Sequence, residues 1–255
     1  MYWKFALVQH PMYFLIKEDT MCAERTPPWG APNIISYIER VRRNLQALDS
    51  FPRLKVGFEW SGLELELLAE EAPDVFQKMC SLAKDGRIAF YNGTYSQPHL
   101  QTLGSESNFR QFERGTAVYK KLCDQQVVTY AHQEASVHDQ VPQLLKAFGL
   151  KYGVVPRFST TLSWLEEGEL VLLAGQGLRF VHGHEFVSWQ GLDGTEVPLY
   201  LSIADPHNRD QIEDFLAREA IAGHLHVPPI LLSVPDLIEV DEAWIAEREK
   251  FDFVL

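Results

Sequence analysis

Residues 127–155 read VVTYAHQEASVHDQVPQLLKAFGLKYGVV, and this stretch decides the fold. It opens with an apolar run at residues 127–131, which predicts a strand. A helix is predicted next, because apolar residues recur at helical spacing, and Gly149 ends it. These residues are Val137, Val141, Leu144, Leu145 and Phe148. A second apolar run begins at Tyr152. A strand, a helix and a strand in this order are typical of a parallel βαβ unit.

The same alternation extends over the first two-thirds of the chain. Strands are predicted at residues 4–10, 54–60, 87–93, 127–131 and 152–155, and helices at 34–48, 63–71, 74–84 and 106–123. Short β runs between residues 170 and 203 predict antiparallel hairpins that are inserted in a barrel or close it. A helix at 211–222 and a strand at 230–234 follow. We therefore predict an α/β fold, an incomplete (β/α)7-type barrel with an inserted β-hairpin region near residues 170–203.

One domain accounts for the whole chain. Its 255 residues are enough for one large barrel, and no linker or fixed repeat divides them. The last five residues, FDFVL, end inside an apolar run that is typical of a strand. We expect residues 1–255 to form a single domain that is part of a longer protein.

Charge and cysteine content restrict the function and the compartment. The chain has 23 basic and 35 acidic residues, a net charge of −12, which argues against nucleic acid or an anionic membrane as partner. No apolar stretch approaches the roughly 20 residues that span a bilayer. Three cysteines, Cys22, Cys80 and Cys123, are widely spaced, which favours free thiols in a reducing compartment. We expect a cytoplasmic protein.

Function in a parallel barrel collects at the C-terminal ends of the strands, where the connecting loops meet. The residues at those positions are carboxylates, imidazoles, amides and aromatic rings, with few cations. They are His10, Glu59, Trp60, Tyr95, Gln97, His99, His132, Gln133, Glu134 and Arg157. Aromatic faces and hydrogen-bonding side chains suit the apolar and hydroxyl surfaces of a small-molecule sugar or an oligosaccharide.

Glu59 and Glu134 form a candidate pair for glycoside chemistry, with one carboxylate as nucleophile or base and the other as acid. Each also has a structural interpretation. Glu59 could be a strand-end carboxylate that pairs with an arginine, and Glu134 could complement the dipole of the next helix. The histidines at the strand ends are better explained as structural or substrate contacts than as metal ligands.

No cofactor is firmly implied. His182 and His184 would share one face of a strand, as a chelate requires, but Gly183 and the neighbouring hairpin signals favour a turn. Sequence signatures of a nucleophile elbow, a phosphate loop, a dinucleotide fold and HExxH are all absent. We therefore assign no metal ligands.

Two long motifs resemble glycoside hydrolase family 38, the α-mannosidases. Residues 86–115, GRIAFYNGTYSQPHLQTLGSESNFRQFERG, are similar to the third-strand region of that family, and residues 130–155 to its nucleophile strand and following helix. The WQGLDG sequence at residues 189–194 resembles a later hairpin. This resemblance implies a barrel of the glycoside hydrolase and deacetylase superfamily.

Three departures from the family 38 pattern affect the site. The His-x-Asp motif after the first strand reads His10-Pro11-Met12, so the zinc site of the family is absent or rebuilt, although zinc remains possible. The acid-Pro-acid turn reads Gln97-Pro98-His99. Gln133 occupies the nucleophile position, and Glu134 lies one residue later, at a strand end where the neighbouring family 57 uses a glutamate.

The leading hypothesis is a glycosidase that acts on an α-linked sugar, as α-mannosidases do. Glu134 is the nucleophile and Glu59 the acid/base candidate in this reading, and the other strand-end residues form the substrate shell. The alternative is a non-catalytic sugar-binding or regulatory module on a degenerate glycosidase barrel. A metal-dependent carbohydrate deacetylase is a third possibility. The sequence leaves the sugar, the stereochemistry and the oligomeric state open.

Overall fold

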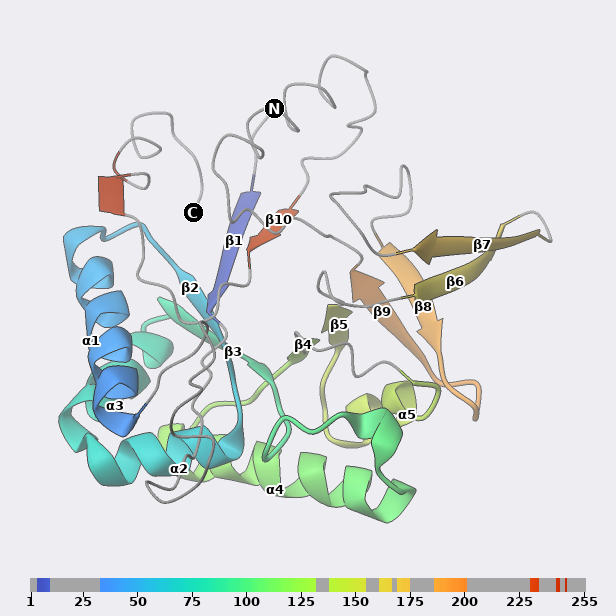
Figure 1. Cartoon of the computed structure of the whole chain (residues 1–255), viewed down its shortest axis with the longest axis horizontal. Coiled ribbons are helices and arrows are strands. Elements are labelled where there is room, and N and C mark those ends of the chain that lie inside the picture. The colour runs from blue at the N-terminus through green and yellow to red at the C-terminus, as the bar shows by residue number, and fades with distance from the viewer. Residues whose placement is uncertain are drawn as a thin grey trace, which may run out of the picture.

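A computed structural model describes residues 4–9, 33–131, 138–154, 161–166, 169–174, 186–200 and 230–233, with residues 242, 243 and 246 (Figure 1). Its strands are β1 (Lys4–Gln9), β2 (Val56–Trp60), β3 (Ile88–Asn92), β4 (Thr129–Ala131), β5 (Tyr152–Val154), β6 (Thr161–Glu166), β7 (Glu169–Ala174), β8 (Phe186–Gln190), β9 (Glu196–Tyr200) and β10 (Ile230–Ser233). Its helices are α1 (Ile34–Ser50), α2 (Gly62–Glu71), α3 (Pro73–Lys84), the 3-10 turn η1 (Leu100–Thr102), α4 (Ser105–Cys123) and α5 (Val141–Ala147).

One mixed sheet organises these elements, with the strand order β10-β1-β2-β3-β4-β5-β9-β8. Every neighbouring pair is parallel except β8 and β9, which form an antiparallel hairpin at one edge. Among the described residues nothing joins β10 to β8, so the sheet is open there. The predicted α/β fold, an incomplete barrel of seven parallel strands, is confirmed.

The region near residues 170–203 differs from the expected insertion in one respect. The antiparallel pair β6–β7 is a separate two-stranded sheet, but β9 pairs in parallel with β5 and so extends the main sheet. The predicted strand at 230–234 appears as β10 beside β1. The predicted helix at 211–222 lies outside the described residues.

Local signals explain where the helices begin. The side chain of Asn33 accepts a hydrogen bond from the backbone N–H of Ser36 and caps α1. Ser61 and Glu64 form a reciprocal capping box at the start of α2. Pro73 occupies the first turn of α3, where its missing N–H has no cost, and thereby separates α2 from α3.

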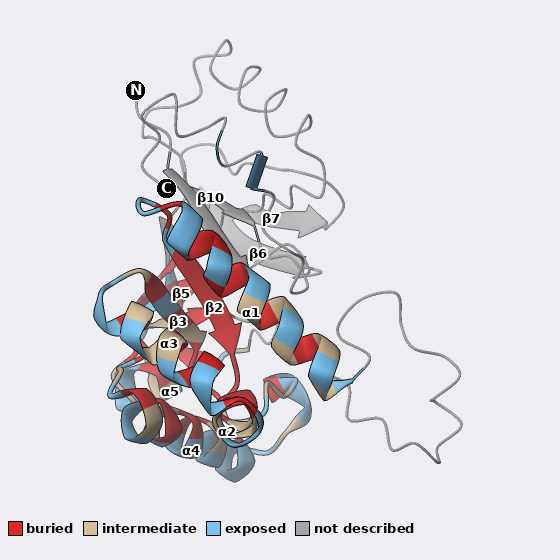
Figure 2. Cartoon of the chain, turned by 90° about the vertical axis from the view of Figure 1, so that its left-hand side faces the viewer, coloured by how far each residue is buried: buried red, intermediate tan, exposed pale blue. Residues whose placement is uncertain are grey.

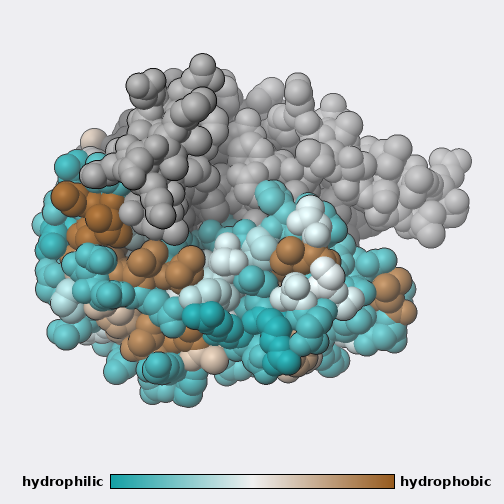
Figure 3. All heavy atoms as spheres, turned by 60° about the horizontal axis from the view of Figure 1, so that its bottom comes forward, coloured by the Kyte–Doolittle hydropathy of each residue, from teal (hydrophilic) through white to brown (hydrophobic). Residues whose placement is uncertain are grey.

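The main core lies between the sheet and its helices. All five residues of β2 are buried, and α1 turns a stripe that includes Val41 and Leu45 towards the sheet (Figure 2). The outer face of the helices is mostly hydrophilic, with separate hydrophobic patches (Figure 3). Within the described part of the chain, no helix combines the length and the apolar character that crossing a bilayer requires.

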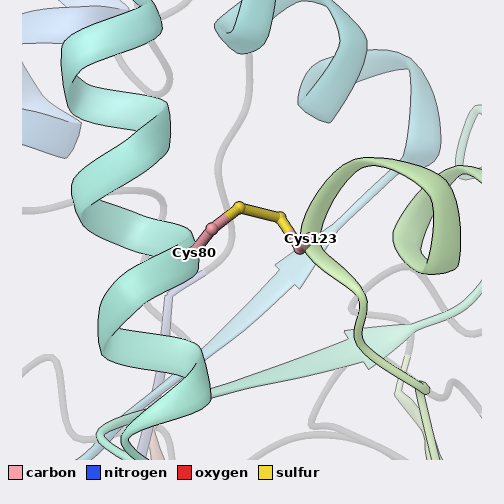
Figure 4. Close-up of a disulfide and its surroundings, with 2 residues drawn as sticks. All are labelled: Cys80 and Cys123. Carbon is pink, nitrogen blue, oxygen red and sulfur yellow. A yellow bond between two sulfur atoms is a disulfide. The ribbon is translucent and has the colours of Figure 1, made fainter.

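A disulfide connects α3 to the last residue of α4. Cys80 and Cys123 are bonded, with their Cα atoms 5.2 Å apart (Figure 4). The prediction of free thiols is therefore wrong for these two residues, because a spacing of 43 residues in the sequence hides their proximity in space. Cys22 lies outside the described residues, and the cytoplasmic location stays a prediction.

Reduction of this disulfide is expected to destabilise the fold. Cross-linking a loop of 43 residues removes unfolded-chain entropy that corresponds to about 4 kcal/mol. Urea unfolding with and without dithiothreitol measures the loss, with a Cys22→Ser variant as control for the remaining cysteine. A thiol titration of the unfolded, unreduced chain should find one reactive cysteine, and a count of three would contradict the disulfide.

Candidate active site

Glu59 is a fully buried carboxylate near the C-terminal end of β2, at the edge of the sheet where the connecting loops begin. The aromatic rings of Phe58 and Trp60 stack on each other at 4.5 Å, and Trp60 also stacks with Phe90 of β3 at 6.4 Å. Phe90 in turn packs against Tyr119 of α4, so these rings occupy the helix-covered face. Because successive side chains alternate along a strand, Glu59 leaves β2 on the opposite, inner face. Its side chain is fully buried.

Trp60 does not fit the substrate-contact role that its position at a strand end suggested. Its side chain has no exposed surface and is part of the core between the sheet and α4. The strand period places it on the face opposite to Glu59, so the two neighbours cannot serve the same cavity. We therefore leave Trp60 out of the proposed site.

Two consecutive residues with positive φ, Asn92 at +88° and Gly93 at +84°, end β3 and begin the loop after it. The Asn92 side-chain oxygen accepts hydrogen bonds from the Thr94 backbone N–H at 3.0 Å and the Thr94 hydroxyl at 2.6 Å. Gly115 of α4 lies directly against the same loop, where a Cβ would stand only 2.8 Å from the Thr94 carbonyl oxygen and would also collide with Gly93. The loop is thus fixed from its first residues.

Further along, this loop is hydrogen-bonded to the end of β2 and the start of α2. The N–H groups of Gly62 and Leu63 donate to the carbonyl oxygens of Thr94 and Tyr95, at 3.0 and 2.8 Å. The side-chain amide of Gln97 donates to the carbonyl oxygen of Glu59 at 2.8 Å. Gln97 has a φ of +49°, a conformation that L residues seldom adopt. This amide holds the backbone at Glu59.

Tyr95 and His99 occupy different surroundings in the same loop. The Tyr95 hydroxyl donates to Glu66 of α2 at 2.8 Å, and the guanidinium of Arg114 lies 3.7 Å from its ring centre. Burial, followed by the bond to Glu66, raises the pKa of Tyr95. His99 is exposed, and its carbonyl oxygen accepts from Thr102 in η1. Tyr95 therefore belongs to a cluster between α2 and α4.

The structure also places a second buried carboxylate close to β2. Glu64 accepts hydrogen bonds from the Ser61 N–H at 3.0 Å and the Ser61 hydroxyl at 2.8 Å. Burial raises the pKa of Tyr119 well above its usual value, and the carboxylates of Glu64 and Glu59 raise it further. The Tyr119 hydroxyl therefore keeps its proton, which it donates to the Trp60 carbonyl oxygen. The capping-box spacing Ser61-x-x-Glu64 was the sequence signal for this carboxylate.

Several predicted site residues lie outside the described residues. These are His10, His132, Gln133, Glu134 and Arg157, as well as the pair His182 and His184. The structure ends β4 at Ala131, three positions before Glu134 in the sequence. No group of three or more potential ligands that could hold a metal ion occurs within the described ranges.

Comparison of the sequence with known proteins identifies a family and a relative of this chain. The family model described as glycosyl hydrolase family 57 matches residues 8–186. A protein named 4-alpha-glucanotransferase, from Thermococcus litoralis, is 26% identical over 140 residues, which are 53% of this chain and 20% of that protein. The chain therefore spans about a fifth of the length of this curated relative.

Solved structures share the fold. The T. litoralis 4-alpha-glucanotransferase superposes with a TM-score of 0.63 at 17% identity, over 98% of this chain and 36% of that one. An α-mannosidase from Enterococcus faecalis gives 0.64 at 14% identity, over 97% and 27%. A putative polysaccharide deacetylase from Mycobacterium smegmatis gives 0.56 at 16%, over 99% and 86%. The barrel superfamily is confirmed, but the matching family is 57, and the likeness to α-mannosidases is one of fold.

Gly115→Ala is expected to destabilise the protein because a methyl group at this position collides with the backbone at Gly93 and Thr94. We expect a loss of about 1–3 kcal/mol in the free energy of unfolding, measured by urea titration. Gly104→Ala, at the start of the same helix, meets no atom within 4 Å and should cost less than about 1 kcal/mol. Equal losses in the two variants would contradict the close approach.

Gln97→Glu is expected to destabilise the protein by about 1–3 kcal/mol at pH 7, because a carboxylate cannot donate to the Glu59 carbonyl oxygen. The bond favours the protonated acid and so raises the pKa of residue 97 in the folded variant. The deficit should therefore be present at neutral pH, diminish as the pH falls through the raised pKa of residue 97 and be largely gone below about 4.

Gln111→Glu is the matched control for this substitution. The side-chain oxygen of Gln111 accepts from the N–H and hydroxyl of Ser96, at 2.9 and 3.2 Å, and a carboxylate preserves both bonds. Its free energy of unfolding should stay within about 1 kcal/mol of the wild-type value. If the two variants lose the same stability at pH 7, Gln97 is not acting as a donor.

Proposed function

The chain belongs to glycosyl hydrolase family 57, and from this membership we propose that it acts on an α-linked carbohydrate by carboxylate catalysis. The single observation that carries the proposal is Glu59, a fully buried carboxylate on the inner face at the C-terminal end of β2. Barrel enzymes place their reacting groups at this edge.

In this proposal Glu134 is the nucleophile and Glu59 the acid/base. Glu134 attacks the anomeric carbon, while Glu59 protonates the departing glycosidic oxygen. Glu59 then takes a proton from a water molecule that releases the sugar from Glu134. The strand order supports the proposal that Glu59 and Glu134 act on the same bond. Only β3 lies between β2, which carries Glu59, and β4, which Glu134 follows in the sequence.

The remaining predicted site residues divide into two groups. His10, His132, Gln133 and Arg157 follow the ends of strands and are proposed to contact the sugar, together with the exposed His99. Gln97 and Tyr95 hold the loop after β3 against β2 and α2 through their side chains, and we assign them a supporting role.

An α-glucan is the proposed substrate class. The support is the relative named 4-alpha-glucanotransferase, which is the more similar in sequence, whereas the α-mannoside expectation derives from family 38 motifs. Transfer to a second sugar and transfer to water share the same first step, so both products belong in the assay. We propose no nucleic acid or membrane partner.

The test is turnover of aryl α- and β-glycosides and of maltooligosaccharides and α-mannosides, with added zinc and with chelator. Glu134→Gln and Glu59→Gln should each lose at least about a thousandfold in kcat while circular dichroism and Tm stay unchanged. Glu113→Gln, an exposed carboxylate of α4, is the matched control and should retain activity.

Each result has a definite meaning. Full activity in Glu134→Gln would exclude it as nucleophile. A silent wild type that binds sugar in calorimetry would favour the non-catalytic sugar-binding module. Release of acetate from an acetylated sugar, abolished by chelator, would favour a deacetylase of the kind that shares this fold.

A further inference from the structure

We propose that the turn of the β8–β9 hairpin, residues 191–195, is a positioning element for residues 138–140, which follow Glu134 in the sequence. The proposal rests on the proposed function, in which Glu134 is the nucleophile. In the sequence, Glu134 lies between Ala131, the last residue of β4, and His138, where the described chain resumes. The hairpin contacts the chain on both sides of this interval.

The contact after the interval is a backbone hydrogen bond. The N–H of Leu192 donates to the carbonyl oxygen of Asp139 at 3.0 Å. Gly191 packs against the same segment, and a Cβ on it would lie 3.2 Å from the Asp139 carbonyl oxygen and 3.3 Å from the Pro142 Cβ. Glycine at 191 thus allows the two backbones to approach closely.

The contact before the interval is made by an aromatic ring. Trp189 of β8 is buried and lies 6.4 Å from the ring of Tyr130, the middle residue of β4. It also covers Gly153 of β5, where a Cβ would come within 3.2 Å of the indole. One hairpin therefore touches β4 through Trp189 and residue 139 through Leu192.

Hydrogen bonds within the turn hold its own conformation, so it can fix the position of the residues that it contacts. The Gly194 N–H donates to the Gly191 carbonyl oxygen at 3.0 Å, and the Gly191 N–H donates to Thr195 at 2.8 Å. The Asp193 carboxylate accepts from the N–H and the hydroxyl of Thr195, both at 2.9 Å, and these bonds lower its pKa. Asp193 therefore stays ionised and holds the turn at neutral pH.

The other side of the segment is fastened to α4. The Ser105 hydroxyl donates to the Gln140 side chain at 3.1 Å, and the amide of the fully buried Asn108 lies 3.3 Å from the His138 ring. The Gln140 N–H donates to the His138 ring at 3.2 Å. Residues 138–140 are thus held between α4 and the hairpin turn.

The contact between Leu192 and Asp139 is better explained by a role in catalysis than by a contribution to stability. The Leu192 side chain is 67% exposed, so the residue adds almost nothing to the core. What it supplies is its N–H, directed at the segment next to a proposed nucleophile, and a nucleophile must be held to within about 0.5 Å of its productive position. Leu192 is therefore a positioning residue that acts through Asp139.

The experiment removes this one donor. Leu192 is the second residue of the turn from Gly191 to Gly194, a position that favours proline, so Leu192→Pro deletes the N–H and keeps the turn. Leu192→Ala keeps the N–H and is the matched control. We expect Leu192→Pro to lower kcat about three- to tenfold with KM and Tm unchanged, and Leu192→Ala to match the wild type.

Hydrogen exchange supplies a readout that does not depend on activity. Peptides that span residues 132–140 should exchange faster in Leu192→Pro than in Leu192→Ala. Equal kcat in the two variants overturns the positioning role, whether or not exchange changes. A wild type that turns over no sugar instead overturns the proposed function, and this is seen before any variant is made.

Discussion

The close contact of the loop after β3 with α4 and α2 is the constraint on which the C-terminal edge of the sheet depends. Gly115 lets the α4 backbone meet Gly93 and Thr94 directly, and α2 begins by donating two N–H groups to the same loop. A side chain at 115 would separate these elements. Once they meet, the Gln97 amide can reach the carbonyl of Glu59, and the end of β2 is held in place.

This constraint makes the burial of two carboxylates possible. Moving a carboxylate out of water is costly unless it is hydrogen-bonded or paired. Glu64 meets that requirement through Ser61, and the buried Tyr119 hydroxyl fixes the Trp60 carbonyl beside it. Glu59 lies on the opposite, inner face, and the Gln97 amide holds its backbone carbonyl. A carboxylate held in this way needs little reorganisation when a substrate arrives.

Periodic features of the fold were predictable from the sequence, and contacts between distant residues were not. The stripe of α1, the break at Pro73 and all the parallel strands except β9 follow from spacing and from proline and glycine chemistry. Trp60 was predicted to contact substrate together with Glu59, although the strand period of two places the two side chains on opposite faces of the sheet. The Cys80–Cys123 bond and the Leu192–Asp139 contact join residues that are far apart in the sequence. No periodic pattern in the sequence indicates such contacts.

The role of Gln97 also gives a physical reason for its difference from the acid-Pro-acid turn of family 38. Its backbone conformation directs the side chain at the carbonyl oxygen of Glu59, 2.8 Å away. An ionised carboxylate at position 97 would face the carbonyl oxygen of Glu59 with another hydrogen-bond acceptor. The amide of glutamine instead supplies the N–H donor that this carbonyl oxygen requires. In this structure the position therefore holds the backbone of Glu59 in β2. The reacting carboxylates of the proposed enzyme come from β2 and from the sequence after β4.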